Sequence, residues 1–116
     1  MSPNLLFVYG TLRSEFNNQY ARLLRKQAAL VGRATVSGSI YRIRHYPGYR
    51  TEPAGEVHGE LYELSDAAIL ETLDDYEGSE FERVTIEVKG AAAWIYQFKE
   101  EPAPGSQIES GDFLAQ

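Results

Sequence analysis

Two short stretches of the chain carry residue types that could do chemistry, and the first is an acidic helix end. The stretch Leu73–Gly78 reads Leu-Asp-Asp-Tyr-Glu-Gly, and the apolar spacing before it predicts a helix whose last turn contains Glu77 and whose C-cap is Gly78. The helix C-terminus and the neighbouring carboxylates Asp74 and Asp75 both disfavour the charged form, so they raise the pKa of Glu77. A carboxyl group with a pKa closer to neutrality is suited to general acid–base catalysis. The alternative is a solvated acidic helix end on an acidic protein.

The second stretch is the turn Tyr9–Leu12, which directly follows the apolar run Leu5–Val8. A run that is apolar at every position predicts a strand covered on both faces. When such a strand enters a glycine-containing turn ahead of a helix, several backbone N–H groups are exposed together, and they can bind a carboxylate or a phosphate. Alternatively, Gly10 merely permits the turn, and Arg13 beyond it is either an anion ligand or an ordinary exposed arginine.

Composition and charge restrict the possible partners. The 116 residues predict a single domain (1–116), and 11 Lys and Arg against 17 Asp and Glu give a formal net charge of -6. This chain therefore lacks the basic footprint expected for binding nucleic acids or anionic membranes. The absence of Cys excludes disulfides, thiolate metal ligands and a cysteine nucleophile, and two histidines are too few for a histidine-rich metal site. With no signal peptide and no apolar run near the roughly 20 residues that span a bilayer, a soluble cytoplasmic protein of undetermined oligomeric state is expected.

The first half of the chain is predicted to supply one helix and a strand-rich segment. Asn18–Ala28 has the apolar spacing of a helix, with Asn17 or Asn18 as its cap. Leu30–Arg44 is either one long bent strand or two consecutive strands, with a bulge or corner at its glycines.

The middle of the chain is predicted as a loop followed by a strand. His45–Gly55 has strong turn chemistry, and its Tyr46 and Tyr49 either line a pocket or cover the end of a barrel. Glu56–Leu64 alternates polar and apolar residues, which predicts a strand with one buried face.

The last half completes a mixed α+β fold. Ser65 is the expected N-cap of the helix that ends at Gly78, and 82–88 and 91–98 are two strands joined by a hairpin at Lys89-Gly90. The total is about five to six strands and two main helices, which favours a small mixed β-barrel with glycines at its corners.

Taken together, the motifs resemble the gamma-glutamylcyclotransferase-like superfamily. The resemblance rests on Tyr-Gly-Thr-Leu after an N-terminal apolar strand, on Leu-Asp-Asp-Tyr-Glu-Gly, and on the following Phe-Glu-Arg-Val at 81–84. Val57–Tyr62 is similar to the central strand of that family. The likeness spans Leu5 to about Phe98, and the compact length is similar to the branch that contains gamma-glutamylamine cyclotransferases.

The resemblance implies a small barrel with a cavity at one end and a reaction that releases 5-oxoproline from a small-molecule γ-glutamyl substrate. Glu77 matches the catalytic acid–base, and the turn matches the backbone that binds the glutamyl carboxylate. Glu77 would take a proton from the α-ammonium, the amine would attack the γ-carbonyl, and Glu77 would return the proton to the leaving amine. Such ring closure needs no protein nucleophile, metal or cofactor. The substrate-binding residues expected are Tyr9, Gly10, Thr11, Leu12, Arg13, Tyr46, Tyr49, Phe81 and Arg83.

The match has one departure, because the family often has Tyr where this chain has Phe81. If that hydroxyl helps to hold substrate, Tyr76, Tyr46 or Tyr49 must replace it. Arg83 either braces the structure by pairing with Glu77 or Asp75, or faces the pocket. Two rival functions remain: a non-catalytic module that binds a small molecule in the same cavity, and a structural protein whose cavity is filled.

Overall fold

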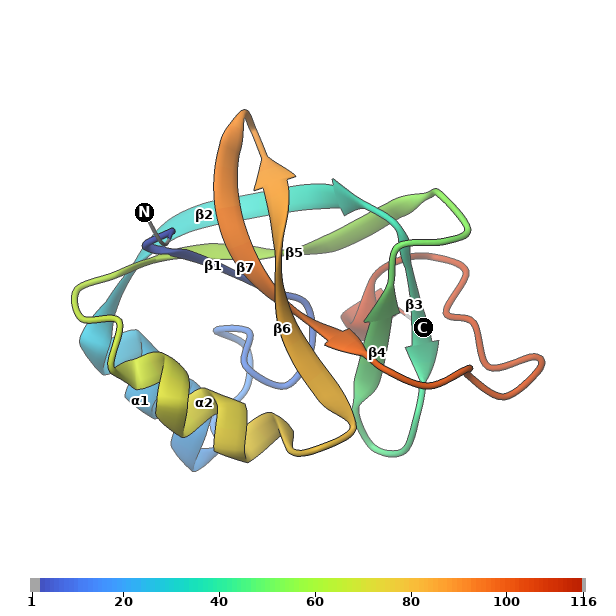
Figure 1. Cartoon of the computed structure of the whole chain (residues 1–116), viewed down its shortest axis with the longest axis horizontal. Helices are drawn as coiled ribbons and strands as arrows, with labels where there is room; N and C mark the ends of the chain where they lie inside the picture. The colour runs from blue at the N-terminus through green and yellow to red at the C-terminus, as the bar shows by residue number, and fades with distance from the viewer. Residues whose placement is uncertain (1–2, 116) are drawn as a thin grey trace.

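The chain folds into a curled sheet against which the two helices α1 and α2 pack side by side (Figure 1). The computed structural model describes residues 3–115. Within these residues the elements are, in order, β1 (Leu5–Val8), α1 (Gln19–Gln27), β2 (Ala28–Ser37), β3 (Ser39–Arg42), β4 (Pro47–Arg50), β5 (Glu56–Leu64), α2 (Ile69–Glu77), β6 (Phe81–Val88), β7 (Ala91–Phe98) and the 3-10 turn η1 (Phe113–Ala115).

The order of the strands explains the curl of the sheet. Neighbouring strands follow the path β2-β5-β1-β7-β4-β3, and β6 pairs with β7. The ends of this path, β2 and β3, are consecutive in the chain and separated only by Gly38, so the sheet bends back on itself toward a barrel. Gly38 has φ +141°, a backbone conformation that other residues rarely adopt. The predicted α+β barrel is confirmed. Of the two alternatives for 30–44, the structure has two consecutive strands with a corner at Gly38, and the described residues form seven strands where about five to six were expected.

β1 is the covered strand that its apolar run predicts. Leu6, Phe7 and Val8 are only 0–3% exposed. Leu6 and Val8 pack into the cluster under the helices, together with Leu24 of α1 and Leu73 of α2, whereas Phe7 belongs to the cluster on the opposite face. Burial of each of these side chains contributes about 1.5–3 kcal/mol to stability. The strand therefore holds the start of the following turn firmly in place.

β5 does not have the one wet face that its alternating pattern predicts. Val57 and Leu61 lie in one core cluster, Tyr62 and Leu64 lie in the other, and all four are at most 5% exposed. The reason is the position of β5 between β1 and β2, where the curled sheet and the helices cover both of its faces. The prediction of a single buried face is therefore wrong.

The segment predicted as a loop after β3 contains the strand β4. This strand pairs antiparallel with β3 and parallel with β7, although Pro47 and Gly48 are typical turn residues. Tertiary contacts outweigh the local preference: Tyr49 is 1% exposed, and its hydroxyl donates a hydrogen bond to the Ser37 carbonyl oxygen at 2.6 Å. The loop prediction is wrong over 47–50.

The ends of the helices are partly as predicted. The Asn18 side chain caps α1 by accepting a backbone N–H of the first turn at 2.8 Å, and Gly78, with φ +85°, ends α2. α2 begins at Ile69, however, and Ser65 is not its N-cap. The Asp66 carboxylate instead accepts the N–H of Ala68 at 2.9 Å in the turn that precedes the helix.

The β6–β7 hairpin forms where it was predicted. Lys89 and Gly90 both have positive φ, +52° and +82°, as a tight two-residue hairpin turn requires.

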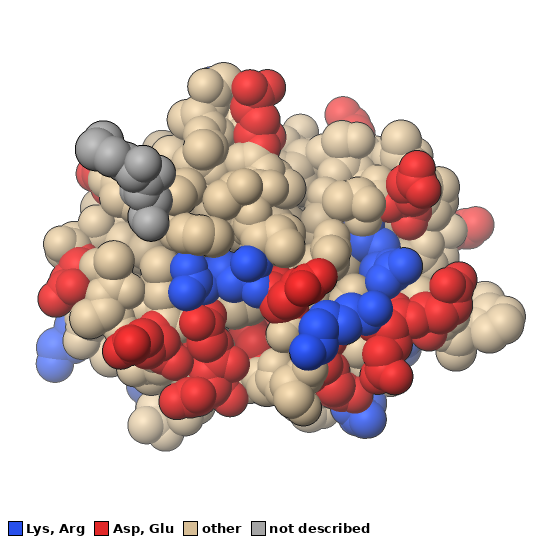
Figure 2. Space-filling view, in the orientation of Figure 1, with Lys and Arg blue, Asp and Glu red and all other residues tan. Residues whose placement is uncertain are grey.

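Charged side chains are unevenly spread over the face that Figure 2 shows. Acidic groups gather in its lower part, over α2 and the adjoining strand ends, with Lys and Arg side chains among them. Within residues 3–115, neither helix is long and apolar enough to cross a membrane.

Candidate active site

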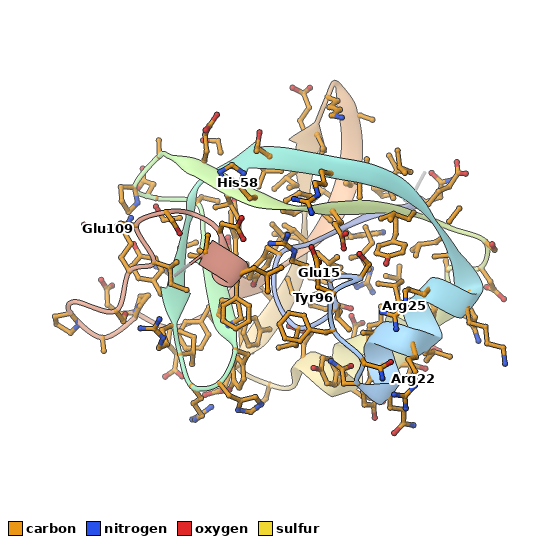
Figure 3. All side chains as sticks on the ribbon, turned by 180° about the vertical axis from the view of Figure 1, so that it is seen from behind. Glu15, Arg22, Arg25, His58, Tyr96 and Glu109 are labelled. Carbon is orange, nitrogen blue, oxygen red and sulfur yellow. The ribbon has the colours of Figure 1, made fainter. Side chains whose placement is uncertain are left out.

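A cavity brings the two predicted stretches together. It encloses about 220 Å³ and is lined by residues from the end of β1, the C-terminus of α2 and the segment that enters β4. Glu77 and all four residues of the turn 9–12 line it. The other lining residues are Phe7, Val8, His45, Tyr46, Pro47, Tyr76, Phe81 and Tyr96. Figure 3 shows Tyr96 near the centre of the molecule, pointing inward from β7.

The turn offers unpaired backbone donors to this cavity. Within residues 3–115, no protein group accepts a hydrogen bond from the N–H groups of Gly10, Thr11 or Leu12. The next N–H, that of Arg13, closes the turn onto the Gly10 carbonyl at 3.0 Å. A side chain at Gly10 would lie 2.8 Å from the ring of Pro47, so the close approach of β4 requires glycine here. Adjacent unpaired N–H groups can bind an anion.

A buried carboxylate holds the far side of the turn. Glu60 of β5 is 3% exposed and accepts hydrogen bonds from the N–H of Ser14 at 2.6 Å and from its hydroxyl at 2.5 Å. Asn18 adds a bond from its side-chain amide to the Thr11 carbonyl at 2.7 Å. Sequence reasoning missed Glu60, because an alternating strand pattern places a glutamate on the wet face by default. The turn is therefore pre-organised by contacts that its own sequence does not reveal.

Glu77, the last residue of α2, has a free carboxylate. Among the described residues, no group donates a hydrogen bond to it. Burial, and after it the negative charge of Asp74, raises the pKa of Glu77 from 4.5 to about 7. At neutral pH the carboxyl group is thus close to equally charged and protonated, and it can accept or donate a proton.

A hydrogen bond ties the helix end to the turn. The Tyr76 hydroxyl lies 2.7 Å from Oγ1 of Thr11, and the Tyr20 ring of α1 packs against Tyr76 with 4.4 Å between ring centroids. The two halves of the candidate site are therefore linked directly.

Arg83 pairs with neither of the two predicted partners, Glu77 and Asp75. Its guanidinium binds both oxygens of Asp74, with Nε–Oδ1 at 2.9 Å and Nη2–Oδ2 at 3.1 Å. Tyr96 also donates its hydroxyl to Oδ1 of Asp74 at 2.6 Å. Arg83 therefore braces α2 through Asp74, which lies one helical turn before Glu77. Arg83 does not line the 220 Å³ cavity.

Two further residues predicted at the site lie outside the cavity lining. Arg13 is 2% exposed, and its guanidinium pairs with Asp112 at 2.8 Å and Glu15 at 3.3 Å. Tyr49 is buried in β4 with its hydroxyl turned to a backbone carbonyl. Conversely, sequence reasoning did not assign the lining residues His45, Pro47 and Tyr96 to the site, because only the folded register reveals which way they face.

Phe81 and Tyr46 do line the cavity, with ring centroids 6.0 Å apart. None of the three tyrosines that could replace a hydroxyl at Phe81 has a free one. Tyr46 donates to Glu80 at 2.8 Å, Tyr76 is bonded to the turn, and Tyr49 bonds a carbonyl of β2.

Known proteins of similar sequence and structure identify the family. The family described as "Gamma-glutamyl cyclotransferase, AIG2-like" matches residues 6–115. A putative gamma-glutamylcyclotransferase from Vibrio cholerae is 38% identical over 115 residues, which cover 95% of both chains. The gamma-L-glutamyl-butirosin B gamma-glutamyl cyclotransferase from Niallia circulans is 31% identical over 111 residues, or 85% of this chain and 69% of that one. A solved structure from Pyrococcus horikoshii superposes with a TM-score of 0.78 at 26% identity, over 97% of this chain and 90% of the other. The chain therefore belongs to the AIG2-like gamma-glutamyl cyclotransferase family, and it is a cyclotransferase-like enzyme.

Proposed function

We propose that the protein converts a γ-glutamyl amine, or a related γ-glutamyl compound, to 5-oxoproline and the free amine. The observation that carries this proposal is that an unpaired carboxylate, Glu77, and the unpaired N–H groups of residues 10–12 line one small cavity. A γ-glutamyl group carries an α-ammonium and an α-carboxylate at the same end. The cavity offers one complementary partner to each: Glu77 for the ammonium and the turn for the carboxylate.

The cavity is small enough that it would enclose only the glutamyl end of the substrate. Its volume of about 220 Å³ is below the ~300–1,000 Å³ of sites for drug-sized ligands. The leaving amine then extends toward the mouth.

The reaction follows from these contacts with no nucleophile from the protein. Glu77 in its charged form takes a proton from the α-ammonium, and the freed amine attacks the γ-carbonyl carbon to form the C–N bond of the ring. Backbone N–H groups of the turn stabilise the negative charge that develops on the γ-carbonyl oxygen. Protonated Glu77 gives its proton to the leaving nitrogen as the old C–N bond breaks. The α-nitrogen loses two protons in all, and the amine that departs as an ammonium ion gains two, so Glu77 returns to its charged form.

The lining of the cavity favours amines without a carboxylate as leaving groups. Its walls near β4 and β6 are His45, Tyr46 and Phe81, and the described lining contains no Lys or Arg. The second carboxylate of a γ-glutamyl amino acid would therefore lack an ion-pair partner. The Niallia circulans relative, whose name gives a γ-glutamyl compound as its substrate, supports the same class of reaction.

The test is release of 5-oxoproline from a panel of γ-glutamyl amines and γ-glutamyl amino acids. Glu77→Gln keeps the size and removes proton transfer, and its expected cost is about 10²–10⁴-fold in rate. Glu71→Gln, the same change at an exposed position of α2, is the matched control and is expected to leave the rate unchanged. Product that persists with Glu77→Gln would assign the catalyst elsewhere.

The main alternative, a non-catalytic binding module, gives a different result in the same experiment. Calorimetry would then detect binding of 5-oxoproline or a γ-glutamyl compound, while no substrate of the panel yields product.

A further inference from the structure

Asp74 lies one helical turn before the proposed catalytic carboxylate, Glu77, and its own carboxylate is held in a fixed position. It precedes Glu77 by three residues on α2, a spacing that places the two Cβ atoms about 5–6 Å apart on one helix face. Three hydrogen bonds hold the Asp74 carboxylate, two from Arg83 and one from the Tyr96 hydroxyl. A carboxylate that is held in this way presents its charge to Glu77 at a constant distance.

Arg83 is itself held in place from its other side. Its guanidinium carbon lies 4.4 Å from the centroid of the Trp94 ring, and the Arg83 side chain is only 23% exposed. Asp74, Arg83 and Tyr96 line a second cavity of about 390 Å³, which shares Phe81 and Tyr96 with the substrate cavity. Phe81 and Tyr96 thus contact both the space beside the ion pair and the cavity that is proposed to bind substrate.

Among the charged side chains of residues 3–115, Asp74 is the one whose charge acts directly on Glu77. Burial raises the pKa of the three tyrosines whose phenols interact with Glu77, so they are neutral near pH 7. The titratable and charged groups around the carboxylate are Tyr9 at the end of β1, His45 and Tyr46 before β4, Asp74 and Tyr76 on α2, Tyr96 on β7, and Arg83 on β6 through Asp74. Asp75, one residue further along α2, is exposed and bonds to none of them.

We propose that Asp74 is a positioning residue for Glu77 and that Arg83 is its counter-charge, so that the pair determines the charge state in which Glu77 meets the substrate. This inference rests on the proposed function, in which Glu77 must first be charged and then protonated. The negative charge of Asp74 favours protonated Glu77, and the positive charge of Arg83 offsets part of that effect. Removing either partner alone therefore changes the proton affinity of Glu77 in opposite directions.

The test compares two variants whose effects have opposite sign. In Asp74→Asn the Glu77 carboxyl is expected to titrate about 0.5–1 pH unit lower, because one negative charge is lost and Arg83 is left unpaired. In Arg83→Met it is expected to titrate higher by a similar amount, because Asp74 is left uncompensated. Arg83→Lys keeps the charge and is expected to stay near the wild type. Asp75→Asn, the same change at the neighbouring position, is the matched control and is expected to produce no shift.

Two readouts separate this inference from the proposed function. One is NMR titration of the Glu77 side-chain carboxyl carbon, assigned by its loss in Glu77→Gln, and it needs no turnover. The other is the acidic limb of kcat/KM against pH, which reports the same group in the free enzyme.

Opposite displacements of the carboxyl titration with Asp74→Asn and Arg83→Met would support the inference. Displacements in the same direction, no displacement, or an equal displacement with Asp75→Asn would overturn it, as would Arg83→Lys behaving like Arg83→Met. If no substrate of the panel yields 5-oxoproline, the proposed function fails, and the NMR titration still decides whether the pair sets the charge of Glu77.

Discussion

The hydroxyl groups of Thr11 and Tyr76 lie 2.7 Å apart, and this hydrogen bond joins the turn after β1 to the last turn of α2. Thr11 belongs to the turn with the unpaired N–H groups, and Tyr76 immediately precedes Glu77. The turn is proposed to bind the α-carboxylate of the substrate, and Glu77 is proposed to bind its α-ammonium. The Thr11–Tyr76 hydrogen bond therefore fixes the distance between these two binding groups.

Loss of this bond should loosen the site more than the fold. Thr11→Val keeps the shape and removes the hydroxyl, and we expect it to cost about 0.5–1.5 kcal/mol of unfolding free energy and a roughly 2- to 10-fold fall in kcat/KM. Urea unfolding and 5-oxoproline release measure the two effects. Thr85→Val, on an exposed position of β6, is the control. A double-mutant cycle with Tyr76→Phe should show that the two changes are not additive; full additivity would mean that the bond is not formed in solution.

The raised pKa of Glu77 predicts a stability that depends on pH in a characteristic direction. The folded protein binds this proton with a pKa of about 7 and the unfolded chain with a pKa near 4.5, so the stabilisation from protonated Glu77 is present below pH 4.5 and is lost as pH rises through 7. Glu77→Gln carries no such charge. We therefore expect the variant to be about 2–3 kcal/mol more stable than the wild type at pH 8 and nearly equal to it at pH 4.5.

Urea unfolding of both proteins at the two pH values measures this difference. Glu71→Gln, on the exposed face of the same helix, should show no comparable gain at pH 8. A Glu77→Gln variant that is less stable than the wild type at both pH values would mean that the charged carboxylate is favourably bound in the folded state.

The buried carboxylate of Glu60 is expected to contribute both to the stability of the fold and to substrate binding. Its two short bonds to Ser14 hold the far side of the turn, and hydrogen bonds to a charged group contribute about 1.5–3 kcal/mol each. A Gln at this position can keep one acceptor but not both charge-assisted bonds. We expect Glu60→Gln to lose about 1–3 kcal/mol of unfolding free energy and to raise KM with a smaller change in kcat, because the turn is proposed to bind the substrate before the chemical step.

The matched control for this prediction is Glu63→Gln, an exposed position of the same strand. If Glu60→Gln and Glu63→Gln unfold at the same urea concentration, the bonds to Ser14 do not contribute to stability as proposed.

Local patterns along the chain were sufficient to predict the elements whose signals are local. The unbroken apolar run at Leu5–Val8 has the pattern of a strand covered on both faces, and Lys89-Gly90 has the positive φ values that its hairpin needs. Glu77 lies at its helix end because Gly78 stops the helix. In each case neighbouring residues determine the outcome.

Features that depend on contacts between residues far apart in the sequence could not be predicted from local patterns. Pro47-Gly48 favours a turn locally, yet pairing with β3 and β7 makes it a strand. The pairing of Arg83 with Asp74 depends on which face of β6 meets α2, a register that periodicity does not encode. The same holds for Glu60, whose burial follows only from the position of β5 inside the sheet.

Phe81 yields a prediction of gained activity. Its ring is 7% exposed, lines the cavity and packs against Phe98 with 5.5 Å between ring centroids, at the position where the family resemblance leads us to expect Tyr. The hydroxyls of Tyr46 and Tyr76, which also line the cavity, are both bonded to protein groups: Tyr46 donates to Glu80, and Tyr76 is tied to Thr11. We expect Phe81→Tyr to add one hydrogen bond to bound substrate, worth about 0.5–1.5 kcal/mol, and to raise kcat/KM roughly 2- to 10-fold.

Phe98→Tyr is the control and should give no gain, because the Phe98 ring packs against Phe81 and is absent from the cavity lining. An unchanged or lower kcat/KM in a folded Phe81→Tyr protein would mean that this chain holds its substrate without a hydroxyl at this position, through the turn and Glu77 alone.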